Sequence, residues 1–217
     1  MKKENQKNFY LGACFLIAFV LWTVLLRYVD VKPIGPKNSR VGLSTLNQFI
    51  HNLTGTNMTL YTITDWLGLV PIAFVLGFGL LGLFQWIKRK HLKNVDYSIF
   101  VLGGFYIVVM AVYLLFETVV INYRPVLISG FLEVSYPSST TLLVMCVMPT
   151  AIMQLNDRLK NSVFKKCLIG VILLFIIFMV AGRIISGVHW ITDIIGGALL
   201  STGLVTLYQA VIQLKKT

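Results

Sequence analysis

Six stretches of the chain carry no charged residue and are long enough to cross a membrane. They are Phe9–Leu26, Trp66–Ile87, Tyr97–Phe116, Ser139–Leu155, Cys167–Gly182 and Ile194–Leu214. A helix needs about 20 apolar residues to cross a hydrocarbon core of about 30 Å, and the two shortest runs can each gain a turn from their flanks. The first run is too long for a secretion signal, and no small-residue cleavage site follows it. The pattern therefore predicts an all-α polytopic membrane protein with six transmembrane helices in a single domain over residues 1–217.

The longest stretch outside these runs is Tyr28–Thr64, between the first two helices. Within it, five apolar residues recur at helical spacing: Leu43, Leu46, Phe49, Ile50 and Leu53. We expect an outer-side loop with a short amphipathic helix at about 28–64, lying either on the outer leaflet or over the mouth of the bundle. Asp65 is expected to cap the second transmembrane helix. Two glycine pairs, Gly103-Gly104 and Gly196-Gly197, are expected where helices pack closely.

Composition and charge agree with this topology. Hydrophobic residues make up 57% of the chain and charged residues only 12%, whereas soluble proteins have about 25% charged residues. The net charge is +11, and most of the 19 basic residues fall on one side of a six-helix topology. That side holds Lys2, Lys3, Lys7, Lys88, Arg89, Lys90, Lys93, Arg158, Lys160, Lys165, Lys166, Lys215 and Lys216. The positive-inside rule makes it cytoplasmic, with both termini.

This charge distribution indicates an integral membrane protein, expected in the bacterial plasma membrane, rather than a protein that binds nucleic acid. The three cysteines, Cys14, Cys146 and Cys167, lie in or next to apolar runs and are interpreted as packing residues. Their spacing suggests neither a disulfide framework nor a metal site. We therefore expect no metal and no cofactor. The oligomeric state is left open.

The outer ends of the predicted helices gather a set of polar residues. They are Glu117, Arg124-Pro125, Pro137-Ser138-Ser139-Thr140, Arg183, His189 and Asp193. Two guanidinium groups can each grip phosphate oxygens in a bidentate fashion, and a helix start offers free N–H groups to an anion. His189 and Asp193 stand four residues apart, so one helix face is expected to carry both, with the carboxylate orienting the ring. This pattern predicts phosphoryl transfer at the outer face.

At these residues the sequence resembles the type 2 phosphatidic-acid phosphatase superfamily of membrane lipid phosphatases. The family's last motif is Ser-Arg, five residues, His, three residues, Asp, and Gly182-Arg183 to His189 and Asp193 match its spacing. The first motif is Lys, six residues, Arg-Pro, where Arg124-Pro125 match and Glu117 replaces the Lys. The middle motif is Pro-Ser-Gly-His, where Pro137-Ser138 match, and Ser139 and Thr140 replace Gly and His.

The resemblance implies a role for each matching residue. His189 would be the nucleophile that forms a phosphohistidine, and Asp193 would orient it. Arg124, Arg183 and Ser138 would bind the phosphate group. Ser139 and Thr140, at the same helix start, are also predicted to bind it. The family's acid histidine is absent at Thr140, and Glu117 is a candidate to replace it as proton donor. His51, the other histidine predicted on the outer side, is interpreted as a polar position on the short surface helix.

The leading hypothesis is thus a metal-independent phosphatase whose partner is a phosphorylated membrane lipid. The substrate would be an isoprenoid (polyprenyl) diphosphate or a glycerolipid phosphate at the outer leaflet. Loss of the acid histidine favours the diphosphate, because a phosphate monoester can leave without protonation whereas an alkoxide cannot. Two alternatives stay open: a non-catalytic relative that binds or translocates phosphorylated lipids, and a structural or assembly protein.

Overall fold

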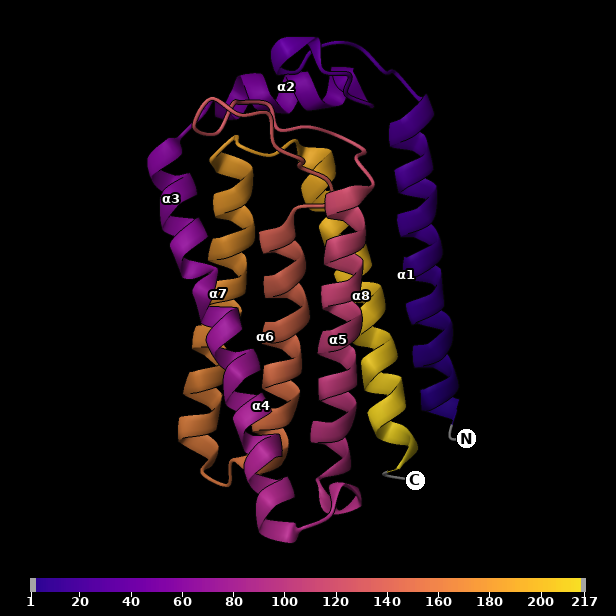
Figure 1. Cartoon of the computed structure of the whole chain (residues 1–217), viewed down its shortest axis with the longest axis vertical. Helices are drawn as coiled ribbons and strands as arrows, with labels where there is room; N and C mark the ends of the chain where they lie inside the picture. Colours follow the sequence, from indigo (N-terminus) through magenta and orange to yellow (C-terminus); the bar gives the residue numbers. More distant parts are fainter. Residues whose placement is uncertain (1–2, 216–217) are drawn as a thin grey trace.

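The chain forms a bundle of long helices with one short helix lying across its end (Figure 1). The computed structural model describes residues 3–215. The helices are α1 (Lys3–Tyr28), α2 (Ser44–Thr54), α3 (Met58–Leu67), α4 (Leu69–Arg89), α5 (Tyr97–Thr118), α6 (Ser139–Arg158), α7 (Ser162–Ile185) and α8 (Ile191–Leu214), with 3-10 turns η1 (Pro36–Asn38) and η2 (Leu92–Asn94). Within these residues there is no strand, and 6 helical spans are long and apolar enough to cross a membrane. The predicted all-α class and number of spans are confirmed.

The second span begins earlier than the sequence suggested. It runs over Met58–Arg89, 32 residues, with a break at Gly68 between α3 and α4. Asn57 caps α3, and its side-chain oxygen accepts a hydrogen bond from Leu60 N at 2.9 Å. Asp65 lies inside α3, so the expectation that it caps the second transmembrane helix is wrong. At 1.5 Å per residue this span is about 48 Å long, so α3 reaches past a hydrocarbon core of about 30 Å.

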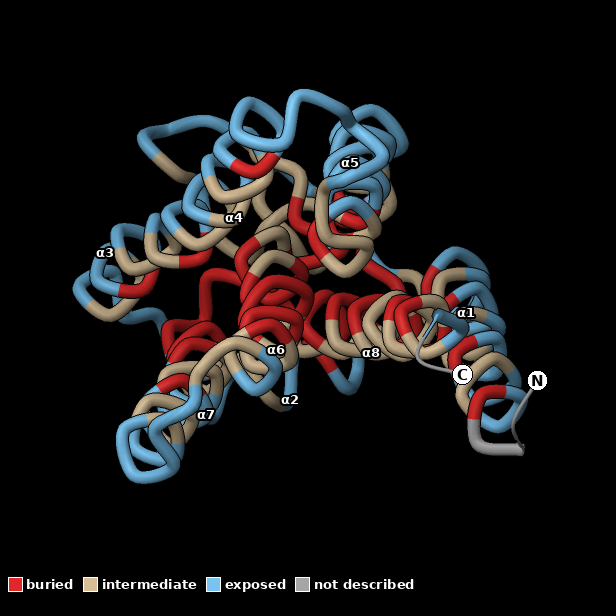
Figure 2. Tube along the Cα trace, turned by 90° about the horizontal axis from the view of Figure 1, so that it is seen from below, coloured by how far each residue is buried: buried red, intermediate tan, exposed pale blue. Residues whose placement is uncertain are grey.

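Helices α6 and α8 form the buried centre of the bundle, as Figure 2 shows. The segment that enters α6 is fixed by Tyr136, whose hydroxyl lies 2.7 Å from Thr23 Oγ1 on α1. A Cβ at Gly196 of α8 would lie 2.5 Å from the Tyr136 ring, so only glycine permits this approach. The prediction of close packing is therefore confirmed at Gly196. It is wrong at Gly103 and Gly104, because no atom lies within 4 Å of a Cβ built at either.

Helix α2 packs over the bundle through a polar residue. The side-chain nitrogen of buried Asn47 donates to Gly42 O at 2.8 Å and to Thr192 Oγ1 at 3.0 Å, at the start of α8. Three apolar residues of the same helix, Leu46, Phe49 and Leu53, are exposed. The helix therefore covers the end of the bundle while presenting apolar side chains outward, which combines features of both placements considered for it.

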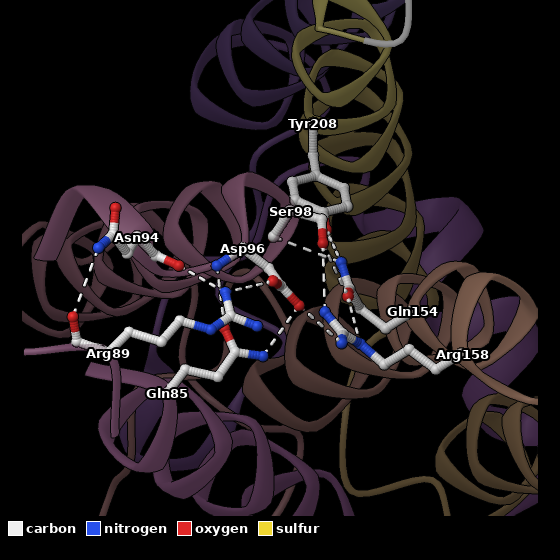
Figure 3. Close-up of polar contacts among 8 residues, drawn as sticks. All are labelled: Gln85, Arg89, Asn94, Asp96, Ser98, Gln154, Arg158 and Tyr208. Atoms are coloured by element: carbon white, nitrogen blue, oxygen red, sulfur yellow. Dashed lines mark hydrogen bonds and ion pairs between the residues drawn. The ribbon is translucent and has the colours of Figure 1, made fainter. Parts of the chain in front are cut away.

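The opposite end of the bundle, where both termini lie, is closed by a polar network (Figure 3). The Asp96 carboxylate pairs with Arg89 Nη1 at 2.8 Å and Arg158 Nη1 at 3.0 Å. The hydrogen bond from Arg89 is the main cause that lowers the pKa of Asp96 to about 2. Arg158 Nε donates to Gln154 Oε1 at 3.3 Å, and Gln154 Nε2 donates to the Tyr208 hydroxyl at 2.7 Å. These contacts tie α4, α5, α6 and α8 together.

Candidate active site

His189 lies in the turn between α7 and α8 and is 4% exposed. Its Nε2 is 3.0 Å from Arg124 Nη1. Because a guanidinium has donors only, Nε2 is the acceptor, which places the proton of the neutral ring on Nδ1. Nδ1 lies 3.7 Å from Asp193 Oδ2, close enough for ion pairing but longer than a hydrogen bond. Since α8 begins at Ile191, His189 precedes the helix, which corrects the expectation that both residues share one helix face.

Asp193 is fully buried in the first turn of α8 and is fixed by two donors. Its Oδ2 accepts from Trp190 N at 3.0 Å, and its Oδ1 accepts from Asn122 Nδ2 at 3.2 Å. A carboxylate at this position also interacts favourably with the positive end of the helix dipole. Asp193 therefore both caps α8 and faces the protonated side of the His189 ring.

The protonation state of His189 follows from its surroundings. The pKa of His189 is lowered to about 4. Burial of the ring is the main cause and the neighbouring Arg124 charge adds to it, whereas Asp193 acts in the opposite direction. The ring is therefore neutral near pH 7, and Nε2 keeps its lone pair. A neutral imidazole is the form that acts as a nucleophile or base, once its Nε2 lone pair is released from the Arg124 hydrogen bond.

Arg124 is held by a loop that folds back on itself between α5 and α6. Arg124 N donates to Glu133 O at 3.0 Å, and Ser135 N donates to Asn122 O at 3.0 Å. The side chains of the first pair also meet, with Arg124 Nε 3.0 Å from Glu133 Oε2. Trp190 Nε1 donates to Tyr123 O at 2.8 Å, which fixes the loop against the segment that carries His189. Arg124 is thus positioned by backbone and side-chain contacts together.

Arg183 reaches the same region from the last turn of α7. Its Nη2 donates to Asp65 Oδ1 at 2.9 Å and also to Thr140 Oγ1. Its buried Nε and Nη1 have no hydrogen-bond partner among the described residues. The Cζ atoms of Arg183 and Arg124 lie 4.9 Å and 5.6 Å from the centroid of the Tyr61 ring. Two guanidinium groups therefore converge on one aromatic ring of α3, where each gains a cation–π contact.

The start of α6 lies beside these arginines. Ser138 is buried, and its Oγ accepts hydrogen bonds from Thr141 Oγ1 at 3.1 Å and Thr141 N at 3.5 Å, so its hydroxyl is engaged in capping the helix. Ser139 and Glu117 line a small cavity together with Arg124 and His189. The structure thus brings together all the predicted site residues except the Ser138 hydroxyl, which turns toward its own helix.

The positive charge at this site comes from arginine side chains. Within residues 3–215, no three His, Cys, Asp or Glu side chains gather where they could hold a metal ion. Arg124 and Arg183 instead offer donors that match the geometry of a phosphate group. The arrangement can therefore receive an anion, with a neutral imidazole beside the two guanidinium groups.

Comparison with known proteins agrees with this geometry. A family model described as the PAP2 superfamily matches residues 71–216. The chain belongs to the PAP2 superfamily. The chain also resembles the crystal structure of a transmembrane PAP2-type phosphatidylglycerolphosphate phosphatase from Bacillus subtilis, with a TM-score of 0.59 and 18% identity over 95% of this chain and 97% of the other. No curated protein matches the chain significantly.

Several residues of this PAP2 site were missed by sequence reasoning. Tyr61 and Asp65 come from α3, which precedes the region that the family model matches. Asn122 and Glu133 flank the matched Arg124 and hold Asp193 and Arg124 in place. Only Asp65 carried a usable signal, because an acidic residue at the edge of a membrane span is costly unless it is paired.

His51, interpreted as a polar position on the surface helix, lies on α2 against the His189 segment. Its ring meets the edge of the Trp190 ring, with centroids 5.5 Å apart. Burial lowers the pKa of His51. It therefore packs behind the site rather than among the residues that line the cavity with His189.

Proposed function

We propose that this PAP2 protein is a phosphatase that removes a phosphate group from a membrane lipid through a phosphohistidine intermediate. The observation that carries the proposal is the position of His189 Nε2, 3.0 Å from a guanidinium that can hold the phosphate group under attack. A nucleophile beside fixed positive charge is the arrangement that phosphoryl transfer needs, because positioning and electrostatic stabilisation supply most of its catalysis.

In this mechanism, Arg124 moves its hydrogen bond from His189 Nε2 to a non-bridging oxygen of the phosphate group, and Arg183 holds another. His189 Nε2 then attacks phosphorus. The bond between phosphorus and the leaving oxygen breaks, and its electron pair leaves with that oxygen. The buried Asp193 carboxylate stabilises the positive ring that forms. Water then attacks the phosphohistidine, which releases inorganic phosphate and restores the neutral ring. The mechanism draws its positive charge from the two arginines and calls for no metal.

A groove between α4 and α5 supports a lipid substrate with a long tail. One apolar cavity of about 370 Å³ begins at Asp65, Ser139 and Thr140. A second, of about 720 Å³, continues to Trp86 and Leu92 at the end that holds the termini. The two cavities share the lining residues Val75, Tyr106 and Met110. We call these two adjoining cavities together the α4–α5 groove.

The length of the α4–α5 groove favours one class of tail. It follows α4, whose 21 residues extend about 31 Å, which matches the full hydrocarbon core. An acyl chain of one leaflet spans only half of that thickness. A polyprenyl chain is long enough to cross the whole core, so we propose a polyprenyl diphosphate as substrate ahead of a glycerolipid phosphate.

The proposed orientation places the termini in the cytoplasm and the site at the outer leaflet of a bacterial plasma membrane. The clustering of lysine and arginine at the termini end of the bundle supports it through the positive-inside rule. Cysteines introduced at Lys37 and Lys90 would test it. A membrane-impermeant reagent added from outside should label position 37 and spare position 90, and the reverse pattern would overturn this orientation.

The function is tested by phosphate release from a panel of lipid mono- and diphosphates in the presence of EDTA. Wild-type protein should release phosphate, His189→Ala should abolish turnover while remaining folded, and Arg124→Ala should weaken binding and rate together. Trapping of labelled phosphate on wild-type protein but not on His189→Ala would identify the intermediate. Lipid binding without any phosphate release would instead favour the non-catalytic relative, to which the missing Lys and acid histidine point.

A further inference from the structure

The Asp65 carboxylate pairs with Arg183, one of the two arginines proposed to bind phosphate. Its Oδ1 lies 2.9 Å from Arg183 Nη2, and it is the carboxylate that pairs with this guanidinium among the described residues. The two partners differ in exposure: the side chain of Arg183 is 2% exposed and that of Asp65 is 59% exposed. The arginine is therefore fixed by packing, whereas the carboxylate lies at the surface of the bundle and can turn away from Arg183.

The approach of Asp65 depends on a glycine of α7. A Cβ at Gly182 would lie 2.7 Å from the Cγ2 methyl of Thr64, so the absence of a side chain lets α3 pack directly on α7. Thr64 is buried there, and the next residue, Asp65, reaches Arg183. Gly182 stands where the family motif has serine. The glycine that replaces the motif serine and the Asp65 carboxylate that reaches Arg183 thus belong to the same contact between α3 and α7.

Arg183 has further donors beyond those engaged by α3 and α6. Its Nε and Nη1 are buried and have no partner among the described residues. Asp65 and Thr140 also line the cavity at the upper end of the α4–α5 groove, beside Ser139. A phosphate group entering from that groove meets the Asp65 carboxylate at the guanidinium it must bind. Asp65 and a phosphate group on the same guanidinium would repel each other, so each weakens the binding of the other.

We propose that Asp65, which pairs with Arg183, competes with phosphate for this guanidinium. The inference rests on the proposed function, because it assumes that phosphate binds Arg183. The carboxylate weakens the hold of the site on inorganic phosphate, so that the product leaves as Asp65 returns. An exposed partner in such a pair is partly screened by water, so we expect its removal to tighten phosphate binding by roughly 3- to 10-fold.

The test is calorimetric titration of inorganic phosphate into purified protein in nanodiscs. Asp65→Asn should bind phosphate more tightly than wild type, and phosphate should inhibit its turnover at lower concentration. Asp30→Asn is the charge-matched control, because it removes the same charge from a half-buried carboxylate that pairs with Lys32 instead of an arginine of the site. Unchanged or weaker phosphate binding by Asp65→Asn would overturn the proposal, the weaker case identifying Asp65 as a residue that positions Arg183.

A second pair of variants tests the packing that presents Asp65. Gly182→Ala places a methyl against Thr64 and should push α3, with Asp65, away from Arg183. Phosphate should then bind more tightly, as in Asp65→Asn. Thr64→Ser removes the opposing methyl and keeps the hydroxyl that donates to Leu60 O. The double variant should therefore return to wild-type affinity, and failure of this rescue would contradict the link between Gly182 and Asp65. Phosphate binding without any lipid hydrolysis would count against the proposed function, whatever the result for Asp65.

Discussion

We predict that hydrolysis of lipid monophosphates by this PAP2 protein depends on Glu117 as a proton donor. A monoester must expel an alkoxide whose conjugate acid has a pKa of about 15.7, whereas a diphosphate expels a phosphate monoester with a second pKa of about 6. The position of the family's acid histidine is taken by Thr140, whose hydroxyl accepts from Arg183. The described carboxylic acids that line the two cavities at this end are Glu117 and Asp65, and Asp65 is paired with Arg183.

The expected size of the effect follows from the role of a proton donor. A positioned general acid accelerates such a step by roughly 10²–10⁴-fold, which corresponds to about 2.7–5.4 kcal/mol in the barrier. Glu117 lines the same cavity as His189 and Arg124, so it is within the space that a bound phosphate group must share. If Glu117 donates the proton, Glu117→Gln should lose monophosphate turnover by that factor and keep diphosphate turnover nearly unchanged.

The assay compares kcat on the mono- and diphosphate of one polyprenol for wild type, Glu117→Gln and Asp65→Asn. If no residue supplies the proton, wild type should already favour the diphosphate by roughly 10²-fold or more. A selective loss on the monophosphate in Asp65→Asn would move the acid role to that residue. Equal rates on both substrates, unaffected by either variant, would refute the leaving-group reasoning.

Three further predictions follow from the structure. Because the pKa of His189 is lowered to about 4 and the ring must be neutral to attack, kcat/KM should be retained well below pH 6.5 and fall only as the pH approaches 4. Asp193→Asn removes the group that raises the pKa of His189, so in this variant the fall in kcat/KM should move to lower pH. Asp96→Asn should lower the free energy of unfolding by about 1 kcal/mol at pH 7, allowing for the exposure of Asp96. The pKa of Asp96 is lowered from 3.8 to about 2 in the folded protein, so this stabilisation is present above pH 3.8 and should vanish on acidification toward pH 2. Thermal unfolding of both proteins across this pH range is the measurement. Gly103 lines the α4–α5 groove, and a Cβ there has no neighbour within 4 Å, so Gly103→Leu should place its side chain in the groove. Turnover of long-chain substrates should then fall selectively, and an equal loss on a short-chain analogue would contradict the assigned role of the groove.

The long uncharged runs predicted the six spans because membrane burial leaves a strong compositional signal over about 20 residues. The same criterion placed the start of the second span too late. It ended the apolar run at Asp65, although the helix begins at Met58 and carries Asp65 within it. A charge inside a span is tolerated when a partner lies nearby, and the partner here, Arg183, is distant in sequence.

The site residues divide along similar lines. Arg124, Arg183, His189 and Asp193 were predicted from spacing along the chain, and the structure brings them together. Tyr61 was not predicted, because its contact with both arginines exists only once α3 packs against α7. The two glycine pairs show the same limit: Gly196 faces Tyr136 and Gly103 faces open space, and no local pattern distinguishes them.

Charge at the site also constrains how a phosphate group can bind. Each arginine is paired with a carboxylate that is at least partly exposed, Arg183 with Asp65 and Arg124 with Glu133, whereas Asp193 is buried and fixed. A phosphate dianion bound at the two arginines would be repelled by the Asp65 and Glu133 carboxylates, which pair with the same guanidinium groups. Because Asp65 and Glu133 are the exposed partners, they are the groups that can turn away, and Asp193 keeps its hold on His189. Substrate binding is thus expected to replace the Asp65 and Glu133 carboxylates with one phosphate group at the two arginines. His189 and Asp193 stay in place.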